Sequence, residues 1–198
     1  MKFLIIGGFL GSGKTSFLLQ LAKHLVQVRG VEKVAILENE VGQVSVDDKI
    51  LTGTGLQVRG MFAGCVCCTM AGELPITVKM IQKELDPDWI IMEATGVAFP
   101  DSIRENLERF LEEAPQVVCL VDAKRWRKLL GPMAQLLPHQ LRGAHKILIN
   151  KVDLVEQEEL EWIKDSIATF NAAASLESFS AVETVPADVL DRIVDWQP

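Results

Sequence analysis

Apolar and polar positions along this chain follow two periods, and these predict strands that alternate with helices. Short apolar runs bounded by polar or turn-forming residues are typical of buried strands in a parallel sheet. Longer stretches in which apolar residues recur every three or four positions predict amphipathic helices. The predicted strands are 3–6, Lys33–Leu37, Trp89–Met92, Val117–Val121 and Lys146–Ile149, and the predicted helices are Lys14–Val28, Ala71–Glu84, Asp101–Glu113, Gln157–Phe170 and Ala187–Asp195.

This alternation predicts an α/β fold of three layers, α/β/α, around a mostly parallel, doubly wound sheet. Ser102 and Glu105 fit the helix-start pattern [ST]-x-x-[DE], and Pro186 suits the start of the last helix. The chain has 198 residues, 48% of them hydrophobic, so we expect one domain over 1–198 with a substantial core. The least regular stretch, Glu38–Met70, is of the length that in compact domains is usually functional or holds small elements of its own.

Composition narrows the classes of function. The net charge of −7 argues against binding to nucleic acid, which needs clustered Lys and Arg. No apolar run reaches 18 residues, so no membrane span is expected. The N-terminus faintly imitates a signal peptide, but a glycine-rich loop occupies the region where cleavage would fall. Three of the four cysteines are crowded together, which is unlike a secreted disulfide framework and favours a reducing cytoplasm.

The first predicted strand runs directly into a loop of the phosphate-binding type, Gly8-Phe9-Leu10-Gly11-Ser12-Gly13-Lys14-Thr15, which matches G-x-x-x-x-G-K-[ST]. Glycines let the backbone turn its N–H groups toward phosphate oxygens, and the following helix adds its positive N-terminal end. Lys14 supplies a charge for the β- and γ-phosphates, and the Thr15 hydroxyl can bind Mg²⁺. A glycine turn that binds nothing is the alternative. The flanking strand and helix favour a P-loop NTPase fold, with nucleotide contacts from Gly11, Ser12, Gly13, Lys14, Thr15 and Ser16.

A second nucleotide motif, Asn150-Lys151-Val152-Asp153, follows the strand at Lys146–Ile149 and matches N-K-x-D. The Asp153 carboxylate can accept two hydrogen bonds from guanine, whereas adenine lacks that donor pair and would leave a buried carboxylate without a partner. The Lys151 stem packs over the base, and the Asn150 side chain fixes the loop. The motif alone can be a solvated turn, but its place about 135 residues after the phosphate loop favours GTP.

A third segment, Ser178-Phe179-Ser180-Ala181, follows a short candidate strand. It is similar to the loop in which a backbone N–H, here that of Ala181, meets guanine O6, with Ser180 beside it. A plain turn is the alternative interpretation.

The strand Trp89–Met92 ends in Glu93-Ala94-Thr95-Gly96. An acidic residue that emerges from a buried strand beside a phosphate loop suits Mg²⁺ binding, directly or through water, and Lys14 and Glu93 are the predicted catalytic pair. Gly96 can bring its backbone N–H to the γ-phosphate, which would make this segment a switch. The alternative for Glu93 is a cap for the next helix. Asp122 is a second candidate at the same sheet edge, and a cap before Ala123–Leu129 is at least as good an interpretation.

The segment Gly64-Cys65-Val66-Cys67-Cys68 carries the rarest chemistry in the chain. Three thiols within four residues can present soft ligands to Zn²⁺, Co²⁺ or Ni²⁺, and a following helix N-terminus would favour the thiolates. A fourth ligand has to come from a carboxylate, His, water or a partner, and Glu38 and Glu40 are candidates. The alternatives are small buried apolar residues, a redox pair or an unrelated loop.

The remaining cysteine and the histidines receive no ligand role. Cys119 lies in an apolar strand and is expected to be buried. His24 is expected on the surface of the first helix, and His139 and His145 have no ligand spacing with the cysteines.

Five motifs in this order resemble the CobW-like GTPases, which are relatives of the hydrogenase and urease nickel-insertion GTPases. They are Gly8–Thr15, Glu38-Asn39-Glu40-Val41-Gly42, Gly64–Cys68, Glu93–Gly96 and Asn150–Asp153. The resemblance extends from Phe3 to about Ala181. It implies a protein that delivers a metal or metallocofactor to a client and uses GTP to switch between holding and releasing states. It places Lys14 and Thr15 on phosphate and Mg²⁺, and Glu93 and Glu40 at switch positions. It places Asn150, Lys151 and Asp153 on guanine, and Cys65, Cys67 and Cys68 on the transition metal.

Two departures from the family pattern matter. The first switch usually reads N-E-F-G, and here Val41 replaces the aromatic residue. Many members carry a C-terminal domain, whereas this sequence ends at Pro198, so a minimal form is expected and a separate protein would supply what that domain does. By resemblance, a homodimer around the nucleotide is a further expectation.

The leading hypothesis from the sequence is a slow GTPase that acts as a metallochaperone or as an accessory protein for a metallocofactor related to cobalamin. Its expected cofactors are GTP or GDP, Mg²⁺ and Zn²⁺ or another thiophilic metal, and its partner would be a client metalloenzyme or corrinoid protein. The alternative is a nucleotide-gated binding module that activates such a client while the cysteines are structural or redox-active.

Overall fold

The computed structural model of this chain describes residues 1–38, 73–181 and 184–195, and within them six strands form one parallel sheet. The sheet order is β2-β3-β1-β4-β5-β6. The strands are β1 (Lys2–Gly8), β2 (Val34–Glu38), β3 (Trp89–Glu93), β4 (Gln116–Asp122), β5 (Lys146–Asn150) and β6 (Ser175–Ser178). The strands expected from apolar runs are therefore confirmed, and the short strand before Phe179 pairs in parallel with β5.

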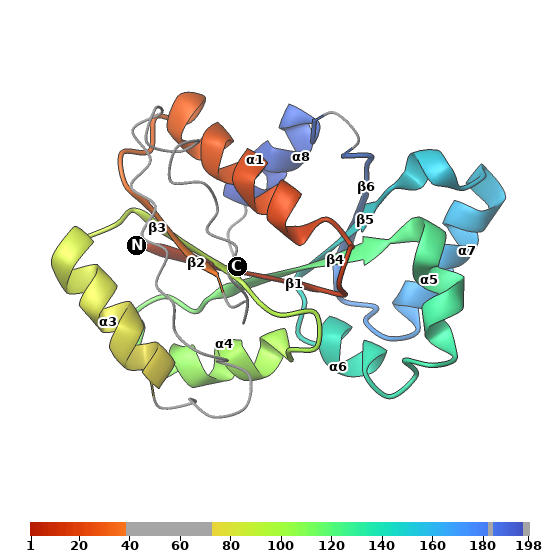
Figure 1. The fold of residues 1–198 in the computed structure, drawn as a ribbon, viewed down its shortest axis with the longest axis horizontal. Coiled ribbons are helices and arrows are strands. Elements are labelled where there is room, and N and C mark those ends of the chain that lie inside the picture. Colours follow the sequence, from red (N-terminus) through yellow and green to blue (C-terminus); the bar gives the residue numbers. More distant parts are fainter. Residues whose placement is uncertain (39–72, 182–183, 196–198) are drawn as a thin grey trace.

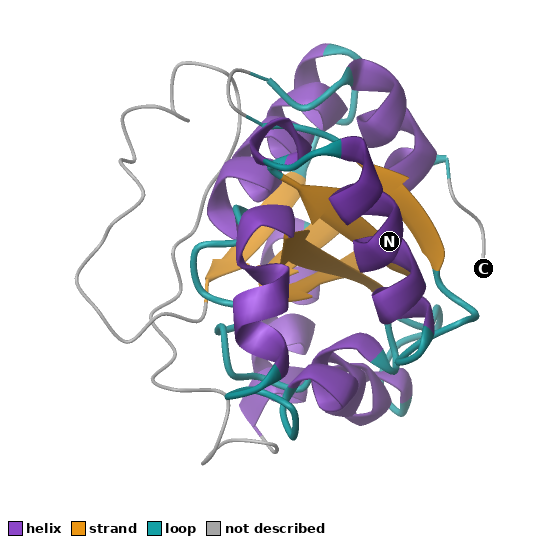
Figure 2. Ribbon diagram, turned by 90° about the vertical axis from the view of Figure 1, so that its right-hand side faces the viewer, coloured by secondary structure: helices purple, strands orange, loops and turns teal. Residues whose placement is uncertain are grey.

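Helices cover both faces of this sheet, so the predicted three-layer architecture is confirmed (Figures 1 and 2). α1 and α8 lie on one face, and α3 to α7 lie on the other. Their bounds are α1 (Lys14–Gln27), α3 (Glu73–Leu85), α4 (Pro100–Glu108), α5 (Ala123–Leu130), α6 (Leu137–Leu141), α7 (Gln157–Ala168) and α8 (Ala187–Val194), with a short 3₁₀ turn at Val152–Leu154. None of these helices in the described ranges is long and apolar enough to cross a membrane.

The two hydrophobic cores arise from the alternation of side chains along each strand. In β1, Phe3 and Ile5 face the core under α3 to α7, whereas Leu4 and Ile6 face the core under α1 and α8. Because successive side chains of a strand point to opposite faces, a strand covered on both sides has to be apolar throughout. This requirement is why short continuous apolar runs in the sequence identified the strands.

Helix α4 begins and ends earlier than its sequence pattern suggested. It starts at Pro100, with Phe99 as N-cap, so Ser102 lies inside the first turn and the predicted capping pattern is not used. Proline is favoured at the first helical position because its fixed φ suits the helix and its missing N–H is not needed there. The helix ends at Glu108 with a tight turn in which Phe110 N donates to Leu107 O at 2.9 Å.

All strands end at one edge of the sheet, where polar or small residues follow the apolar runs. β1 lies between β3 and β4, which is the point where the strand order reverses and where ligands bind in open α/β sheets. The register brings the ends close together, with Ile6 beside Glu93 and Asp122 beside Asn150. The motifs predicted from the sequence therefore meet at this edge.

His24 is buried, and the expectation that it lies on the surface was wrong. Its imidazole Nε2 lies 2.8 Å from Asp191 Oδ1 on α8, and only 6% of the residue is exposed. Arg29 also contacts Asp191, at 3.2 Å. α8 is more than 150 residues away in the sequence and covers this face of α1, so the periodicity of α1 alone could not reveal the contact.

We predict that Asp191→Asn lowers the free energy of unfolding at neutral pH, and that the difference from wild type disappears at acidic pH. The hydrogen bond from His24, with Arg29 nearby, lowers the pKa of the Asp191 carboxyl. A carboxyl whose folded-state pKa is depressed contributes stability above its unfolded pKa, about 4, and loses it as pH falls through the folded-state value. Chemical denaturation of both proteins from neutral pH to about pH 3 measures this difference.

Asp188→Asn is the matched control because Asp188 is also on α8 and, among the described residues, pairs with Arg192 at 2.9 Å and not with His24. A stability difference for Asp191→Asn that stays constant with pH would contradict the role assigned to the carboxylate.

Candidate functional site

The phosphate loop lies between β1 and α1 and adopts the backbone that its glycines permit. Gly8, Gly11 and Gly13 have φ values of 125°, 77° and 101°, which side chains disfavour. A Cβ at Gly13 would lie 2.5 Å from Asn150 Nδ2, so this glycine is required by space as well as by conformation. The loop and its neighbours line a pocket of about 440 Å³, formed by Leu10, Gly11, Gly13, Lys14, Thr15, Ser16, Glu93, Asn150, Lys151, Asp153, Leu154 and Ala181.

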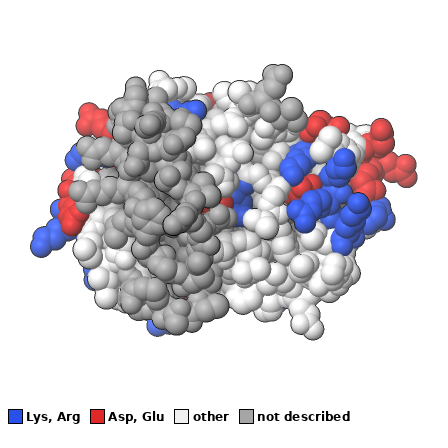
Figure 3. All heavy atoms as spheres, in the orientation of Figure 1, with Lys and Arg blue, Asp and Glu red and all other residues white. Residues whose placement is uncertain are grey.

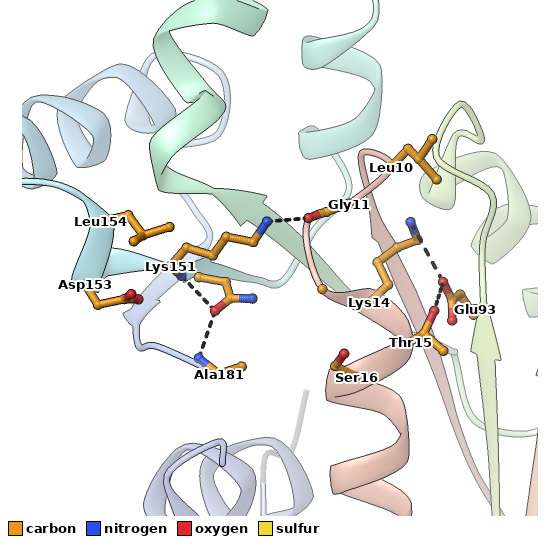
Figure 4. Close-up of a pocket in the computed structure, with 12 residues that line it drawn as sticks. Leu10, Gly11, Lys14, Thr15, Ser16, Glu93, Lys151, Asp153, Leu154 and Ala181 are labelled. Carbon is orange, nitrogen blue, oxygen red and sulfur yellow. Dashed lines mark hydrogen bonds and ion pairs between the residues drawn. The ribbon is translucent and has the colours of Figure 1, made fainter. Parts of the chain in front are cut away.

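At one end of this pocket, α1 and β3 bring Lys14 and Thr15 close to Glu93. These are the residues predicted for phosphate and magnesium chemistry. Thr15 Oγ1 donates to Glu93 Oε1 at 3.1 Å, and Lys14 Nζ lies 3.8 Å from the same oxygen (Figure 4). Lys14 also donates to Phe9 O at 3.4 Å. The Lys14 ammonium and the Glu93 carboxylate are both buried. Removing one of them would be costly, because the other charge would be left buried without a partner.

The oxygens of Thr15 and Glu93 suit Mg²⁺, which prefers a hydroxyl or one or two carboxylates together with phosphate oxygens. The two oxygens lie 3.1 Å apart at the wall of the pocket that Lys14 also lines. This closeness of two oxygen ligands beside the phosphate loop fits such an ion. Glu93 does not cap α4, whose N-cap is Phe99, so the cap interpretation of Glu93 was wrong.

Asn150 is the central residue of the other half of the site. Its Nδ2 donates to Ser12 O at 2.9 Å, which ties β5 to the phosphate loop. Its Oδ1 accepts from Lys151 N at 2.7 Å and from Ala181 N at 3.1 Å, which holds the two base-side loops together. The prediction that the Asn150 side chain fixes its loop is confirmed, and the bond from Ala181 N joins the second loop to it.

Asp153 lies at the rim of the pocket, where the Ser180 hydroxyl donates to its carboxylate. Asp153 is exposed, whereas the sequence argument considered a buried carboxylate. None of the residues in the short turn Val152–Leu154 is buried. Ser180 is therefore a partner of Asp153 rather than a pocket wall.

Lys151 and Arg125 hold the outer side of the phosphate loop. Lys151 Nζ donates to Gly11 O at 2.7 Å and lies 2.6 Å from Asp122 Oδ2. Arg125 Nη1 donates to Leu10 O at 2.9 Å from the first turn of α5. With Asn150 on Ser12 O, three consecutive carbonyls of the loop, those of Leu10, Gly11 and Ser12, each accept a side-chain donor.

Asp122 has two roles here, and neither is the magnesium role considered for it. Its Oδ1 accepts from Arg125 N at 3.1 Å and caps α5, as the alternative interpretation held. Its Oδ2 pairs with Lys151, and Asp122 is absent from the described lining of the pocket. Sequence reasoning missed both this ion pair and Arg125. An acid at a strand end followed by a basic helix was an available signal for Arg125, and no local pattern pointed to Lys151. Figure 3 shows that basic face of α5 beside acidic side chains.

The transition-metal residues Cys65, Cys67, Cys68 and Glu40 lie outside the described residues. Among the residues that the structure does describe, no three His, Cys, Asp or Glu side chains are grouped so that they could hold a metal ion. Cys119 is buried as expected, and burial raises its pKa to about 12, so it is a neutral thiol at physiological pH.

The family described as "CobW/HypB/UreG, nucleotide-binding domain" matches residues 2–177 of this chain. The chain is similar to the zinc chaperone YjiA of Escherichia coli, at 30% identity over 86% of this chain and 54% of that protein. It is also similar to zinc-regulated GTPase metalloprotein activator 1 of Dictyostelium discoideum, at 27% identity over 87% of this chain and 44% of that protein. The chain thus spans about half the length of these curated relatives.

Among solved structures, the hydrogenase maturation factor HypB of Archaeoglobus fulgidus has a similar fold. Its TM-score is 0.72, its identity to this chain is 19%, and the match covers 98% of this chain and 89% of that one. At this identity the likeness concerns the fold alone, and it agrees with the parallel sheet and P-loop described above.

We predict that Asp122→Asn and Asp122→Ala separate the two roles of this residue. Asn remains a good helix cap but removes the charge that holds Lys151, whereas Ala removes both. Loss of the cap costs about 0.5–2 kcal/mol, so Asp122→Ala is expected to be the less stable variant by about that amount in chemical denaturation. Both variants should bind GDP more weakly than wild type because Lys151 loses its anchor. Wild-type GDP affinity in Asp122→Asn would contradict the anchoring role.

Proposed function

This chain belongs to the CobW/HypB/UreG nucleotide-binding domain family, and from that premise we propose that it is a GTP-dependent metallochaperone domain that holds zinc at Cys65, Cys67 and Cys68. GTP binds in the pocket at the carboxyl edge of the sheet, and nucleotide state controls the metal. The observation that carries the proposal is the position of Glu38. β2 ends there in register with Glu93, and the segment that contains the cysteines begins immediately after it.

The nucleotide half of the proposal is supported by the arrangement of the two motifs around one pocket. Lys14 and Thr15 stand at one end, and Asp153 and Ala181 stand at the other. The volume of about 440 Å³ falls in the range of small-molecule sites. Lys14 lines the pocket at the motif position that binds phosphates, and Lys151 and Arg125 bond the carbonyls behind the phosphate loop, which favours a phosphate ligand there.

In this site the residues of the chain divide the work of binding and hydrolysis. Lys14 neutralises charge on the β- and γ-phosphates, and the Asp153 carboxylate accepts hydrogen bonds from guanine. Thr15 and Glu93 would hold Mg²⁺, which neutralises charge on the phosphates when bound. Among the described residues, the pocket is lined by neither Gln nor Arg, so no water-positioning Gln or arginine finger is present there. We therefore expect slow intrinsic hydrolysis.

The metal half of the proposal is supported by the thiol chemistry of the sequence and by the relatives. Three cysteines in four residues favour a thiophilic ion such as Zn²⁺ over Mg²⁺. The two curated relatives named above are a zinc chaperone and a zinc-regulated GTPase metalloprotein activator. A client metalloenzyme is the partner that this chemistry implies. A corrinoid client, a cobalamin-related role and a homodimer remain predictions from the sequence.

We predict that Asp153→Asn reduces the preference for GTP over ATP at least about tenfold, because one hydrogen bond to a charged acceptor is worth about 1.5–3 kcal/mol. Competition between labelled GDP and unlabelled GTP or ATP measures the preference. Asp165→Asn, an exposed change on α7, is the control. If Asp153→Asn discriminates as well as wild type, guanine recognition lies elsewhere.

We predict that replacing Cys65, Cys67 and Cys68 together with Ser abolishes tight zinc binding, whereas Cys119→Ala leaves it unchanged because the Cys119 thiol is buried and neutral. Zinc titrations with GDP and with a non-hydrolysable GTP analogue should give different affinities in wild type.

Unchanged zinc affinity in the triple variant would remove the metallochaperone proposal and favour the nucleotide-gated binding module. Equal affinities with both nucleotides would remove the coupling. A disulfide found by mass measurement without reductant would favour the redox alternative.

A further inference from the structure

Gln140 on α6 is a buried side chain that reaches the loop after β3. Only 1% of the residue is exposed, and its Nε2 donates to Gly96 O at 2.7 Å. The same nitrogen lies 3.5 Å from Ala98 O. Two carbonyls on one side of the amide fix its orientation, because an oxygen facing them would be repelled. The other end, Oε1, is buried and has no hydrogen-bond partner among the described residues.

Gly96 lies against Leu10 of the phosphate loop, and Leu10 lines the pocket. Gly96 follows Glu93, which lines the pocket, and a Cβ at Gly96 would lie 2.7 Å from Leu10 N in the phosphate loop. Glycine is therefore required here by the close approach of two backbones. Within the part of the chain that the structure describes, the Gly96 N–H donates to no backbone carbonyl.

Two bonds set the direction of the peptides on either side of Gly96. Thr95 O accepts from Ala98 N at 3.0 Å, which orients the peptide that carries the Gly96 N–H. Gln140 orients the next peptide through Gly96 O. In a planar trans peptide the C=O and the N–H point in opposite directions, so a carbonyl held toward α6 turns the Val97 N–H away from α6. Gln140 thus fixes the half of this loop that Thr95 leaves undetermined.

The backbone of Gln140 is itself anchored in the core. Cys119 Sγ donates to Gln140 O at 2.9 Å from the middle of β4. Burial raises the pKa of this thiol to about 12, so it remains protonated and keeps its donor. Through this bond, the Gln140 amide joins the loop after β3 to β4 in the central sheet.

We propose that Gln140 is a positioning residue: through Gly96 O it fixes the Gly96–Val97 peptide, and with it the shape of the loop that meets the γ-phosphate. It touches neither nucleotide nor metal and acts through Gly96. The proposal rests on the proposed binding of GTP in this pocket and adds to it a residue that distinguishes triphosphate from diphosphate. GDP has no γ-phosphate to reach Gly96, so its binding does not depend on Gln140.

The test compares Gln140→Met with wild type for binding of GDP and of a non-hydrolysable GTP analogue, without transition metal. Met keeps the length of the side chain and removes the donor. We expect analogue affinity to fall about three- to tenfold, the effect of one hydrogen bond, and GDP affinity to stay within about twofold. Leu137→Met, also buried on α6 but without a polar contact, is the matched control and should leave the ratio of the two affinities unchanged.

Gln140→Glu supplies a readout that a purely structural role would not move. A carboxylate cannot donate to Gly96 O, whereas a protonated carboxyl can, and burial raises the pKa of such a group. The analogue affinity of Gln140→Glu should therefore recover toward wild type as pH falls from about 8 to about 5.5, with no such recovery in Gln140→Met.

Equal losses of GDP and analogue affinity in Gln140→Met, or no loss of either, would overturn the positioning role while leaving the proposed function intact. A Gln140→Glu variant that shows no recovery at low pH would also overturn it. If wild type binds neither guanine nucleotide, the proposed function itself fails.

Discussion

A phosphate loop can turn its N–H groups toward a ligand only if the carbonyls of the same peptides are held on the opposite side. Here the carbonyls of Leu10 and Ser12 accept from Arg125 and Asn150, so the N–H groups of Gly11 and Gly13 face the other way. Gly11 O accepts from Lys151. The donors come from α5 and from the end of β5, more than 100 residues later in the chain. The phosphate site therefore exists only when the second half of the sheet has formed.

The same contacts join phosphate recognition to base recognition. Lys151 belongs to the guanine motif, yet its ammonium bonds the phosphate loop and pairs with Asp122. Asn150 bonds the phosphate loop, its own loop and Ala181. A displacement of either loop has to move the other, because buried polar groups that lose a partner without gaining another cost about 1–3 kcal/mol each. The two motifs thus behave as one rigid cradle, in which the backbone strain of Lys151, with φ of 65°, is held in place.

Much of the fold and part of the site could be predicted from the sequence. Strands β1, β3, β4 and β5 are continuous apolar runs covered on both faces, and that pattern has few alternatives. Lys14, Thr15, Glu93 and Asn150 were identified because motifs place them at strand ends. Three contacts could not be predicted: Asp122 with Lys151, Gln140 with Gly96, and His24 with Asp191. Each joins residues 29 to 167 positions apart in the sequence, and no local sequence pattern around one partner indicates the other. α6, with five residues, is too short for its period to be seen.

The geometry also limits which segments can move when the bound nucleotide changes. Thr15, Lys14 and Glu93 are buried or bonded to one another at the ends of a strand and a helix, so they cannot shift far without breaking the core. The cradle around Asn150 is equally constrained. The loop at 94–99 is held by a few bonds beside Leu10, and β2 ends at Glu38, in register with Glu93. In the proposed function, a signal from the γ-phosphate would pass through one of these two places, and the sequence after Glu38 is the one that contains the cysteines. Because coupling between two binding sites is reciprocal, a metal that senses GTP by this route must change the affinity for GTP by the same factor.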